Sequence, residues 1–315
     1  MKSKFINSLQ NNDLATLKQI PKSDLHNHAT RGGNIKYVLK NSEEVLANLP
    51  KKFTNLTDMQ SWYEANIKLH CKGLHGFVNR IEAAFLHALD DGVQTLVLSF
   101  GLADSIHYNN SYKDYINDIK HIHQRIAPEI NFIPELSLSR TQNIVEMEEI
   151  FEQLLSYNFF KSIDLIGDEN IAVDEFKSIY KKAKQHNLIR KAHIGEFSDA
   201  LSVKNVVEAL DLNQVQHGIA AVNSQKVMNF LADNKIQLNI CPTSNVMLSL
   251  VNSYREHPIS ILHENGIPIT INTDDMLIFN QSVSQEYLNL YNNGVLSATE
   301  LNEIRETGLG VIKTK

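Results

Sequence analysis

Short apolar runs alternate along the chain with longer segments whose apolar residues return every three or four positions. The short runs are typical of buried parallel strands and the longer segments of amphipathic helices, among them residues 173–185, 203–210 and 224–234. Eight strands are expected, at residues 24–28, 93–100, 131–138, 162–166, 189–193, 214–217, 236–240 and 268–273. This alternation predicts an α/β fold in which the parallel strands close into a (β/α)8 TIM barrel.

The segment between the first and second expected strands is far longer than a crossover helix requires. It contains Phe53, Trp62 and Phe77 among helix-compatible stretches. We expect a helical cap over about residues 30–92 that covers the C-terminal face of the barrel and excludes water from a pocket there. The alternative is a packing element with no role in substrate binding. No flexible or charged linker divides the chain, so residues 1–315 are expected to form a single hydrolase barrel domain.

Three expected strands end in side chains that bind metals. His26 and His28 point the same way on a strand because they are two residues apart. His193 and Asp274 also end strands, and the C-terminal ends of parallel strands meet at one face of a barrel. Three imidazoles and a carboxylate suit Zn²⁺, so we expect these four residues to hold one zinc ion per chain. The alternative is a coincidence of such residues at strand ends.

A metal held in this way lowers the pKa of a bound water toward about 7, which supplies hydroxide at neutral pH. Glu196, three residues after His193, is suited to donate a proton to a substrate ring nitrogen. His217 ends the sixth expected strand and is suited to orient the attacking water or to stabilise its developing charge. Asp275, next to Asp274, is suited to accept a hydrogen bond from substrate. Taken alone, Glu196 also fits a helix N-terminus, and His217 a hydrogen-bonded core histidine.

The composition is that of an ordinary globular protein, with 43% hydrophobic and 21% charged residues. A formal net charge of -6 gives no electrostatic attraction to nucleic acid. Cys71 and Cys241 are too few for a disulfide framework. Neither an apolar secretory signal nor a membrane-length apolar run is visible, so we expect a cytoplasmic protein. The expected partner is a small molecule, with no nucleic acid and no membrane, and the oligomeric state is left open.

Several ordered motifs resemble those of the adenosine deaminase family, within the metal-dependent amidohydrolase superfamily. The resemblance extends over roughly residues 20–290, and so many motifs in one order are specific. Besides the two histidines of the first strand, the motifs are Asp-Leu-Ile-Gly-Asp-Glu at residues 164–169, His-Ile-Gly-Glu at 193–196, Gln-His-Gly at 216–218, Cys-Pro-Thr-Ser-Asn at 241–245, His-Pro at 257–258 and Asn-Thr-Asp-Asp at 272–275.

The resemblance implies a zinc-dependent hydrolase that replaces an exocyclic amine of an adenosine-like or other aminopurine substrate with oxygen and releases ammonia. It implies the same four metal ligands that the strand ends indicate. Glu196 would protonate the ring nitrogen beside the attacked carbon, and His217 and Asp274 would handle the water. Gly167 and Asp275 would hydrogen-bond other ring nitrogens.

Two residues of the expected pocket mouth depart from the family pattern. After His28 the family usually has Leu-Asp-Gly, whose carboxylate is associated with a ribose hydroxyl, whereas here Ala29, Thr30 and Arg31 follow. Thr30 and Arg31 are expected to line the pocket. Because a guanidinium suits phosphate or carboxylate, unmodified adenosine is not expected to be the best substrate. The alternative is that Arg31 points to solvent or pairs with a carboxylate of the cap.

Other classes of protein fit parts of the pattern. Another amidohydrolase would act on a different heterocyclic amine or a cyclic amide with two metals. However, Gly167 and Asp168 follow the fourth strand, where such relatives often carry a metal-bridging lysine. A non-catalytic nucleoside-binding barrel would have no chemical use for Glu196 beside a metal. The other zinc deaminase type needs a His-x-Glu motif and a Pro-Cys-x-x-Cys motif, both of which the chain lacks.

Overall fold

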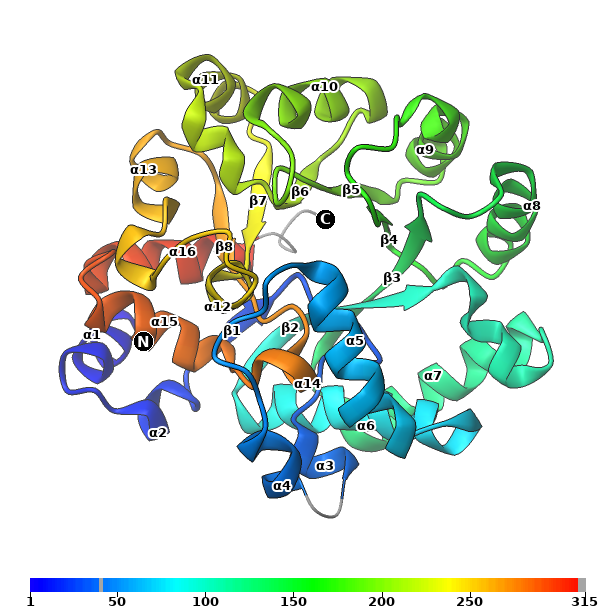
Figure 1. Cartoon of the computed structure of the whole chain (residues 1–315), viewed down its shortest axis with the longest axis horizontal. Helices are drawn as coiled ribbons and strands as arrows, with labels where there is room; N and C mark the ends of the chain where they lie inside the picture. The colour runs from blue at the N-terminus through cyan, green and yellow to red at the C-terminus, as the bar shows by residue number, and fades with distance from the viewer. Residues whose placement is uncertain (40–41, 311–315) are drawn as a thin grey trace.

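The structure, a computed structural model, describes residues 1–39 and 42–310, so residues 40, 41 and 311–315 of the expected single domain lie outside the described residues. Eight parallel strands form one sheet whose order follows the chain, and they lie at the centre of Figure 1. The strands are β1 Lys22–Asp24, β2 Val93–Gly101, β3 Asn131–Ser139, β4 Ser162–Ile166, β5 Ile189–Ile194, β6 Gln214–His217, β7 Gln237–Ile240 and β8 Ile269–Ile271. The (β/α)8 barrel predicted from the sequence is confirmed.

Helices form an outer ring around these strands (Figure 1). Those connecting successive strands are α6 Gly73–Asp90, α7 Tyr112–Ile126, α8 Ile144–Leu155, α9 Lys177–Gln185, α10 Ala200–Leu210, α11 Gln225–Asp233 and α13 Ile259–Glu264. The other helices outside the first insertion are α1 Lys2–Gln10, α2 Leu14–Leu17, α15 Val283–Asn292 and α16 Ala298–Gly310. Two short helices, α12 Pro242–Met247 between β7 and β8 and α14 Met276–Phe279 after β8, lie inside the ring (Figure 1). Across the part of the chain that the structure describes, no helix has the length and apolarity to span a bilayer.

The helices pack as their sequence pattern predicts. The expected helical segments at residues 173–185, 203–210 and 224–234 correspond to α9 with the 3-10 turn Asp174–Phe176, to α10 and to α11. On α7, the hydroxyl of Ser111 accepts the amide hydrogen of Asp114 at the first turn, and Ile116 and Ile119 are buried on one face. These residues join one large apolar core that includes strand residues such as Leu98.

β1 is shorter than the sequence pattern predicts and ends at Asp24 instead of residue 28. The amide of Leu25 donates to the side-chain oxygen of Asn272 at 2.7 Å, so it does not join the ladder with β2. A single bridge between His28 and Ser99 resumes that pairing. The two histidines after β1 therefore lie on a stretch held by isolated hydrogen bonds, and not on a continuous strand.

β8 also ends before the predicted residue 273, because the amide of Thr273 bonds to a side chain. The first and last strands of the barrel meet beside it. The amide of Thr273 donates to the carboxylate of Asp24 at 3.2 Å. The amide of Asp274 then donates to the carbonyl of His26 at 3.0 Å, beside a parallel bridge between Asn27 and Asp274. These contacts join the first and last strand ends and bring two of the expected metal ligands together.

The insertion after β1 contains α3 Ile35–Val38, α4 Ser42–Ala47, α5 Leu56–Asn66 and the 3-10 turn Lys68–His70 before α6. Figure 1 shows α5 inside the ring of helices, across the barrel mouth with α12 and α14. Phe53 and Trp62 pack with ring centroids 5.9 Å apart and join a second apolar cluster with Met247 and Phe279. The predicted cap over the C-terminal face is confirmed. Phe77 is not part of it, because this residue of α6 packs in the barrel core.

A buried ion pair joins β3 and β5 inside the barrel. Lys191 Nζ lies 2.7 Å from Glu135 Oε2 and donates to the carbonyl of Leu25 at 3.1 Å. Because Lys191→Met leaves a buried carboxylate without its cation, we expect the free energy of unfolding to fall by about 3–5 kcal/mol, measured by urea denaturation. Adding Glu135→Gln is expected to recover part of that loss. Wild-type stability of Lys191→Met would contradict this role of the pair.

Candidate active site

The strand ends bring the four expected metal ligands together. The ring centroids of His26 and His193 lie 4.8 Å apart, and those of His26 and His28 lie 5.2 Å apart. Asp274 Oδ1 lies 3.3 Å from His28 Nε2 and 3.5 Å from His26 Nε2. The cluster therefore joins residues that follow β1 and β8 with a residue near the end of β5.

The donor atoms of this cluster fit a metal ion. Neither ring nitrogen of His26 makes a hydrogen bond to any of the residues that the structure describes, although the side chain is fully buried. A buried polar atom without a partner is costly unless something else binds it. The ligand atoms of His26, His193 and His217 lie within 4.8 Å of one another, as do those of His28 and the neighbouring carboxylates. Imidazoles with a carboxylate are donors that Zn²⁺ prefers.

A carboxylate, that of Asp164, lies against one of these histidines. Asp164 Oδ2, on β4, lies 3.0 Å from Nδ1 of His193 on the adjacent strand β5. The other ring nitrogen, Nε2, is left for the cluster. Such carboxylate–imidazole contacts fix the ring orientation of metal-binding histidines. Sequence reasoning included Asp164 only as the start of a motif and assigned it no role.

Glu196 and His217 face each other beside the cluster. His217 Nε2 lies 3.6 Å from Glu196 Oε2 and 3.9 Å from Asp274 Oδ2. Burial raises the pKa of Glu196 well above its usual value, and the nearby charge of Asp274 raises it further. This shift favours the protonated form of Glu196, which is the form that a general acid needs.

The backbone is strained where these residues lie. His217 has a φ of 60° and Asp274 a φ of 62°, in the left-handed region that residues other than glycine rarely adopt. Such strain persists where surrounding contacts hold it, often at functional sites. Gly167, which follows β4, has a φ of 105° that favours glycine at this position.

A cavity of about 550 Å³ separates this cluster from the cap. Its volume is within the range of roughly 300–1,000 Å³ typical of small-molecule sites. Helix α5 supplies Leu56, Met59 and Gln60 to its wall. Nine of the ten expected site residues also line it, with His26 buried beneath: His28, Thr30, Arg31, Gly167, His193, Glu196, His217, Asp274 and Asp275.

Arg31 ties the barrel to the cap. Its Nη1 donates to Asp275 Oδ2 at 2.9 Å, and its Nη2 donates to Gln60 Oε1 at 2.7 Å. The guanidinium also lies over the ring of Tyr63, 4.4 Å from its centroid. Arg31 therefore lines the cavity as expected, and it pairs with a carboxylate of the barrel and an amide of the cap instead of with solvent or a carboxylate of the cap. Asp275 Oδ1 is buried with no hydrogen-bond partner within residues 1–39 and 42–310.

Glu169 organises the loop that carries the acid. Its carboxylate accepts hydrogen bonds from the amides of Gly195 at 2.8 Å, Ser198 at 2.9 Å and Glu196 at 3.2 Å. Hydrogen bonds to a carboxylate are among the stronger ones in proteins, so they fix the loop after β5. The sequence pattern shows Glu169 as the end of a motif, but its partners lie in a different segment of the chain.

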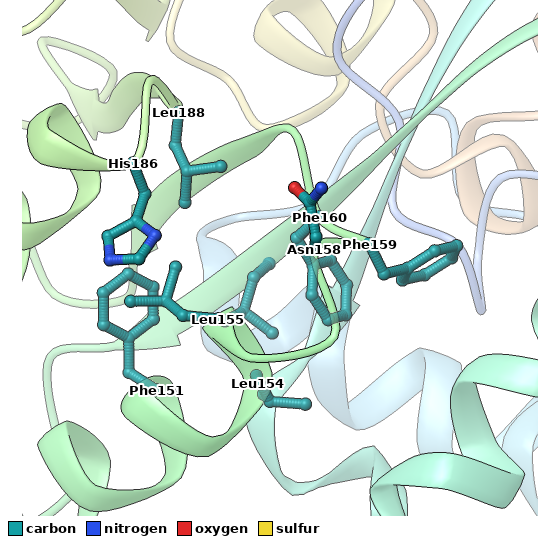
Figure 2. Close-up of a pocket in the computed structure, with 9 residues that line it drawn as sticks. Phe151, Leu154, Leu155, Asn158, Phe159, Phe160, His186 and Leu188 are labelled. Carbon is teal, nitrogen blue, oxygen red and sulfur yellow. The ribbon is translucent and has the colours of Figure 1, made fainter.

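A second cavity is much smaller and is lined mostly by apolar side chains. Figure 2 shows that α8 contributes Phe151, Leu154 and Leu155 to its wall, together with His186 and Leu188. Its volume is about 20 Å³, which is room for about one water molecule. It lacks the convergent polar groups of a binding site, so the candidate site is the large cavity under the cap.

A barrel with side chains suited to hold a metal at its strand ends, a buried acid and a capping helix is the arrangement of a metal-dependent hydrolase of the amidohydrolase class. The sequence model of the family described as adenosine deaminase matches residues 133–311. A Treponema pallidum protein with the provisional name adenosine/adenine deaminase is 31% identical over 283 residues, which cover 90% of this chain and 94% of that protein. The chain belongs to the adenosine deaminase family, and it is a hydrolytic deaminase.

Solved structures share the fold at lower identity. An adenine deaminase from Arthrobacter aurescens superposes with a TM-score of 0.80 at 20% identity and covers 94% of each chain. The N6-methyl-AMP deaminase from Arabidopsis thaliana gives a TM-score of 0.76 at 19% identity, over 92% of this chain and 90% of that one. At these identities the likeness shows the fold alone, and the family resemblance stated from the motifs is confirmed by the sequence matches.

Proposed function

We propose that this protein is a zinc-dependent hydrolytic deaminase of an aminopurine, with one zinc ion per chain. The observation that carries the proposal is the convergence of three imidazoles, the Asp274 carboxylate and the buried acid Glu196 at one cavity. The names of relatives support the substrate class, because they include adenosine/adenine deaminase and N6-methyl-AMP deaminase. The whole chain would act as one hydrolase domain, in which α5 is the part of the cap that reaches the cavity.

In this proposal His26, His28, His193 and Asp274 would hold the zinc ion. When bound, the ion supplies hydroxide at neutral pH to attack the ring carbon that bears the amine. Protonated Glu196 would donate its proton to the adjacent ring nitrogen, so that the ring accepts the electron pair displaced by the attack. The proton of the added hydroxyl group would then pass through the carboxylate of Asp274 to the exocyclic amine. As the carbon–nitrogen bond breaks, the ring carbon keeps the oxygen as a carbonyl and the amine leaves as ammonia.

Gly167 and Asp275 are proposed to recognise other ring nitrogens. Gly167 lines the cavity at the end of β4, and the buried oxygen Asp275 Oδ1 needs a partner. A polar group left unmatched in a buried site costs roughly 1–3 kcal/mol, so a heterocycle without matching groups would bind poorly. The expected ligand is therefore a small nitrogen heterocycle.

Ammonia release from a panel of aminopurines tests this function. The panel contains adenine, adenosine, adenosine phosphates, and 5'-modified and N6-substituted adenosines. We expect the zinc-loaded protein to release ammonia from at least one of them. Because Thr30 and Arg31 stand where the family usually has an acidic residue, adenosine is not expected to have the highest kcat/KM. Release from a cyclic amide with none from any aminopurine would contradict the proposal.

The same panel with Arg31→Ala tests the substrate preference. The substitution removes the contacts to Asp275 and Gln60 at the pocket wall, so we expect the ranking of kcat/KM to change. Lys36→Ala is a control, since Lys36 pairs with Asp90 and does not line the cavity. The assignment should be dropped if adenosine leads by a wide margin in the wild type, or if Arg31→Ala leaves every preference unchanged.

A further inference from the structure

A line of hydrogen bonds runs behind the site from α13 to His217. The amide of Ile259 donates to Nδ1 of His257 at 3.2 Å. Nε2 of His257 lies 3.2 Å from Asn245 Oδ1, and Asn245 Nδ2 lies 3.3 Å from Nδ1 of His217. His257, Asn245 and His217 are all buried, at no more than 2% exposure. Each polar atom in the line therefore depends on its neighbour in the protein.

The start of α13 explains why this line exists. Ile259 is the first residue of the helix, so its amide has no carbonyl partner within the helix. The preceding residue, Pro258, has no amide hydrogen to offer. The amide of Ile259 therefore turns to the ring of His257. The two motifs that contain Asn245 and His257 supply neither a proposed metal ligand nor the acid. This line of hydrogen bonds gives both motifs a role in the site.

The backbone amide fixes the direction of every bond in the line. An amide N–H only donates, so Nδ1 of His257 accepts and carries no proton. The one proton of that ring is then on Nε2, which donates to Asn245 Oδ1. The amide nitrogen of Asn245 is left to donate to Nδ1 of His217. An imidazolium has no lone pair with which to accept this bond, so His217 is neutral and carries its proton on Nε2.

We propose that Asn245 and His257 are positioning residues that present His217 to the reaction as an N–H donor. The protonated Nε2 is the atom that lies 3.6 Å from Glu196 Oε2 and 3.9 Å from Asp274 Oδ2. It therefore donates a hydrogen bond to the attacking oxygen and to the negative charge that develops there. It has no free lone pair with which to bind metal or remove a proton. His217 therefore acts only as a hydrogen-bond donor, and proton transfer is left to the carboxyl groups of Glu196 and Asp274.

The environment of His257 supports this direction of the hydrogen bonds, from the amide of Ile259 towards His217. Burial lowers the pKa of His257 to about 3, so the ring is neutral at neutral pH. Its two hydrogen-bond partners are amide groups, one of the backbone and one of Asn245. A neutral ring between an obligate donor and an amide has only one tautomer that makes both bonds. The kinetic consequence for His217 rests on the proposed function, whereas the tautomer does not.

Nitrogen-15 NMR of the zinc-loaded protein measures the tautomer directly. With labelled histidine, the signals of His217 are those that disappear in His217→Gln. We expect a proton on Nε2 and none on Nδ1. A proton on Nδ1 of His217 would overturn the proposal. This measurement needs no substrate, so it is independent of whether the protein deaminates an aminopurine.

Kinetics with the best substrate of the panel provide the second test. Asn245→Leu keeps the approximate size but neither donates nor accepts, so the ring of His217 is free to place its proton on either nitrogen. We expect kcat to fall by roughly 10–100-fold, because losing a donor to a developing charge outright costs roughly 10²–10³-fold. KM is expected to change less, because His217 acts on the attacking oxygen. Asn229→Leu, on the exposed face of α11, is a control that should leave kcat unchanged.

Two variants of His257 keep the test valid if Asn245→Leu does not fold. His257→Leu removes the donor to Asn245 and is expected to lower kcat in the same way. His257→Gln retains an N–H that can reach Asn245 Oδ1 and is expected to restore kcat toward the wild-type value. A purely packing role would not favour glutamine over leucine. Values of kcat within twofold of wild type for His257→Leu would overturn the positioning role.

Discussion

The double variant His26→Ala plus His193→Ala is expected to lose both the metal and detectable turnover. The two rings lie 4.8 Å apart, His193 in the cavity wall and His26 beneath it, and no hydrogen bond from the described residues satisfies the nitrogens of His26. Removing both leaves two of the four expected ligands, which is fewer than the three protein ligands typical of catalytic zinc. Elemental analysis should find about one zinc per chain in the wild type and a small fraction of that in the variant.

A matched control replaces two exposed histidines. His75 and His121 lie on the surface, and neither lines the cavity, so His75→Ala plus His121→Ala should keep metal and activity. Two equivalents of metal in fully active protein would contradict a single-ion site. Retention of metal by the first variant would contradict the ligand assignment.

Glu196→Gln is expected to lower kcat by roughly 10²–10⁴-fold, the range typical of a general acid–base group. The amide has nearly the size of the carboxyl group, so fold and metal content should remain. Burial and the charge of Asp274 raise the pKa of Glu196, which favours the form that has a transferable proton. Glutamine has no such proton. Steady-state kinetics should therefore show a loss in kcat and a smaller change in KM.

Glu264→Gln, at an exposed position of α13, provides the comparison for this variant. It makes the same chemical change outside the cavity, so kcat should equal the wild-type value. A decrease of only about twofold for Glu196→Gln would remove that residue from the mechanism, since acid–base steps contribute far more.

Much of the fold could be predicted because strands and helices depend on local pattern. β4 and β6 have the bounds expected from their apolar runs, residues 162–166 and 214–217. β1 and β8 were predicted too long. Beyond the strand ends, the amides of Leu25 and Thr273 bond to the side chains of Asn272 and Asp24, which come from the opposite end of the chain. No local pattern contains that information.

The candidate site likewise has parts that the local sequence pattern predicts and parts that depend on contacts between distant segments. That the four proposed metal ligands lie together could be inferred because each follows an apolar run, and the ends of such runs meet in a closed barrel. The residues that support them could not, because their roles depend on polar contacts between distant segments. Glu169 bonds the loop after β5, and Asn245 bonds His257. The partner of Arg31 was missed because Asp275, 244 positions later in the chain, had been considered only as a substrate ligand.

The cap has an apolar cluster of its own, distinct from the barrel core. This cluster joins the cap to α12 and α14, the helices that follow β7 and β8. Substitutions within it alter the entrance to the site while the contacts between strands and outer helices remain. If the cap and the barrel shared one core, most substitutions near the entrance would also destabilise the barrel. Selection would eliminate them, because natural proteins have little stability to spare. A lineage of these enzymes can therefore acquire a new substrate preference through its cap without first evolving a more stable barrel.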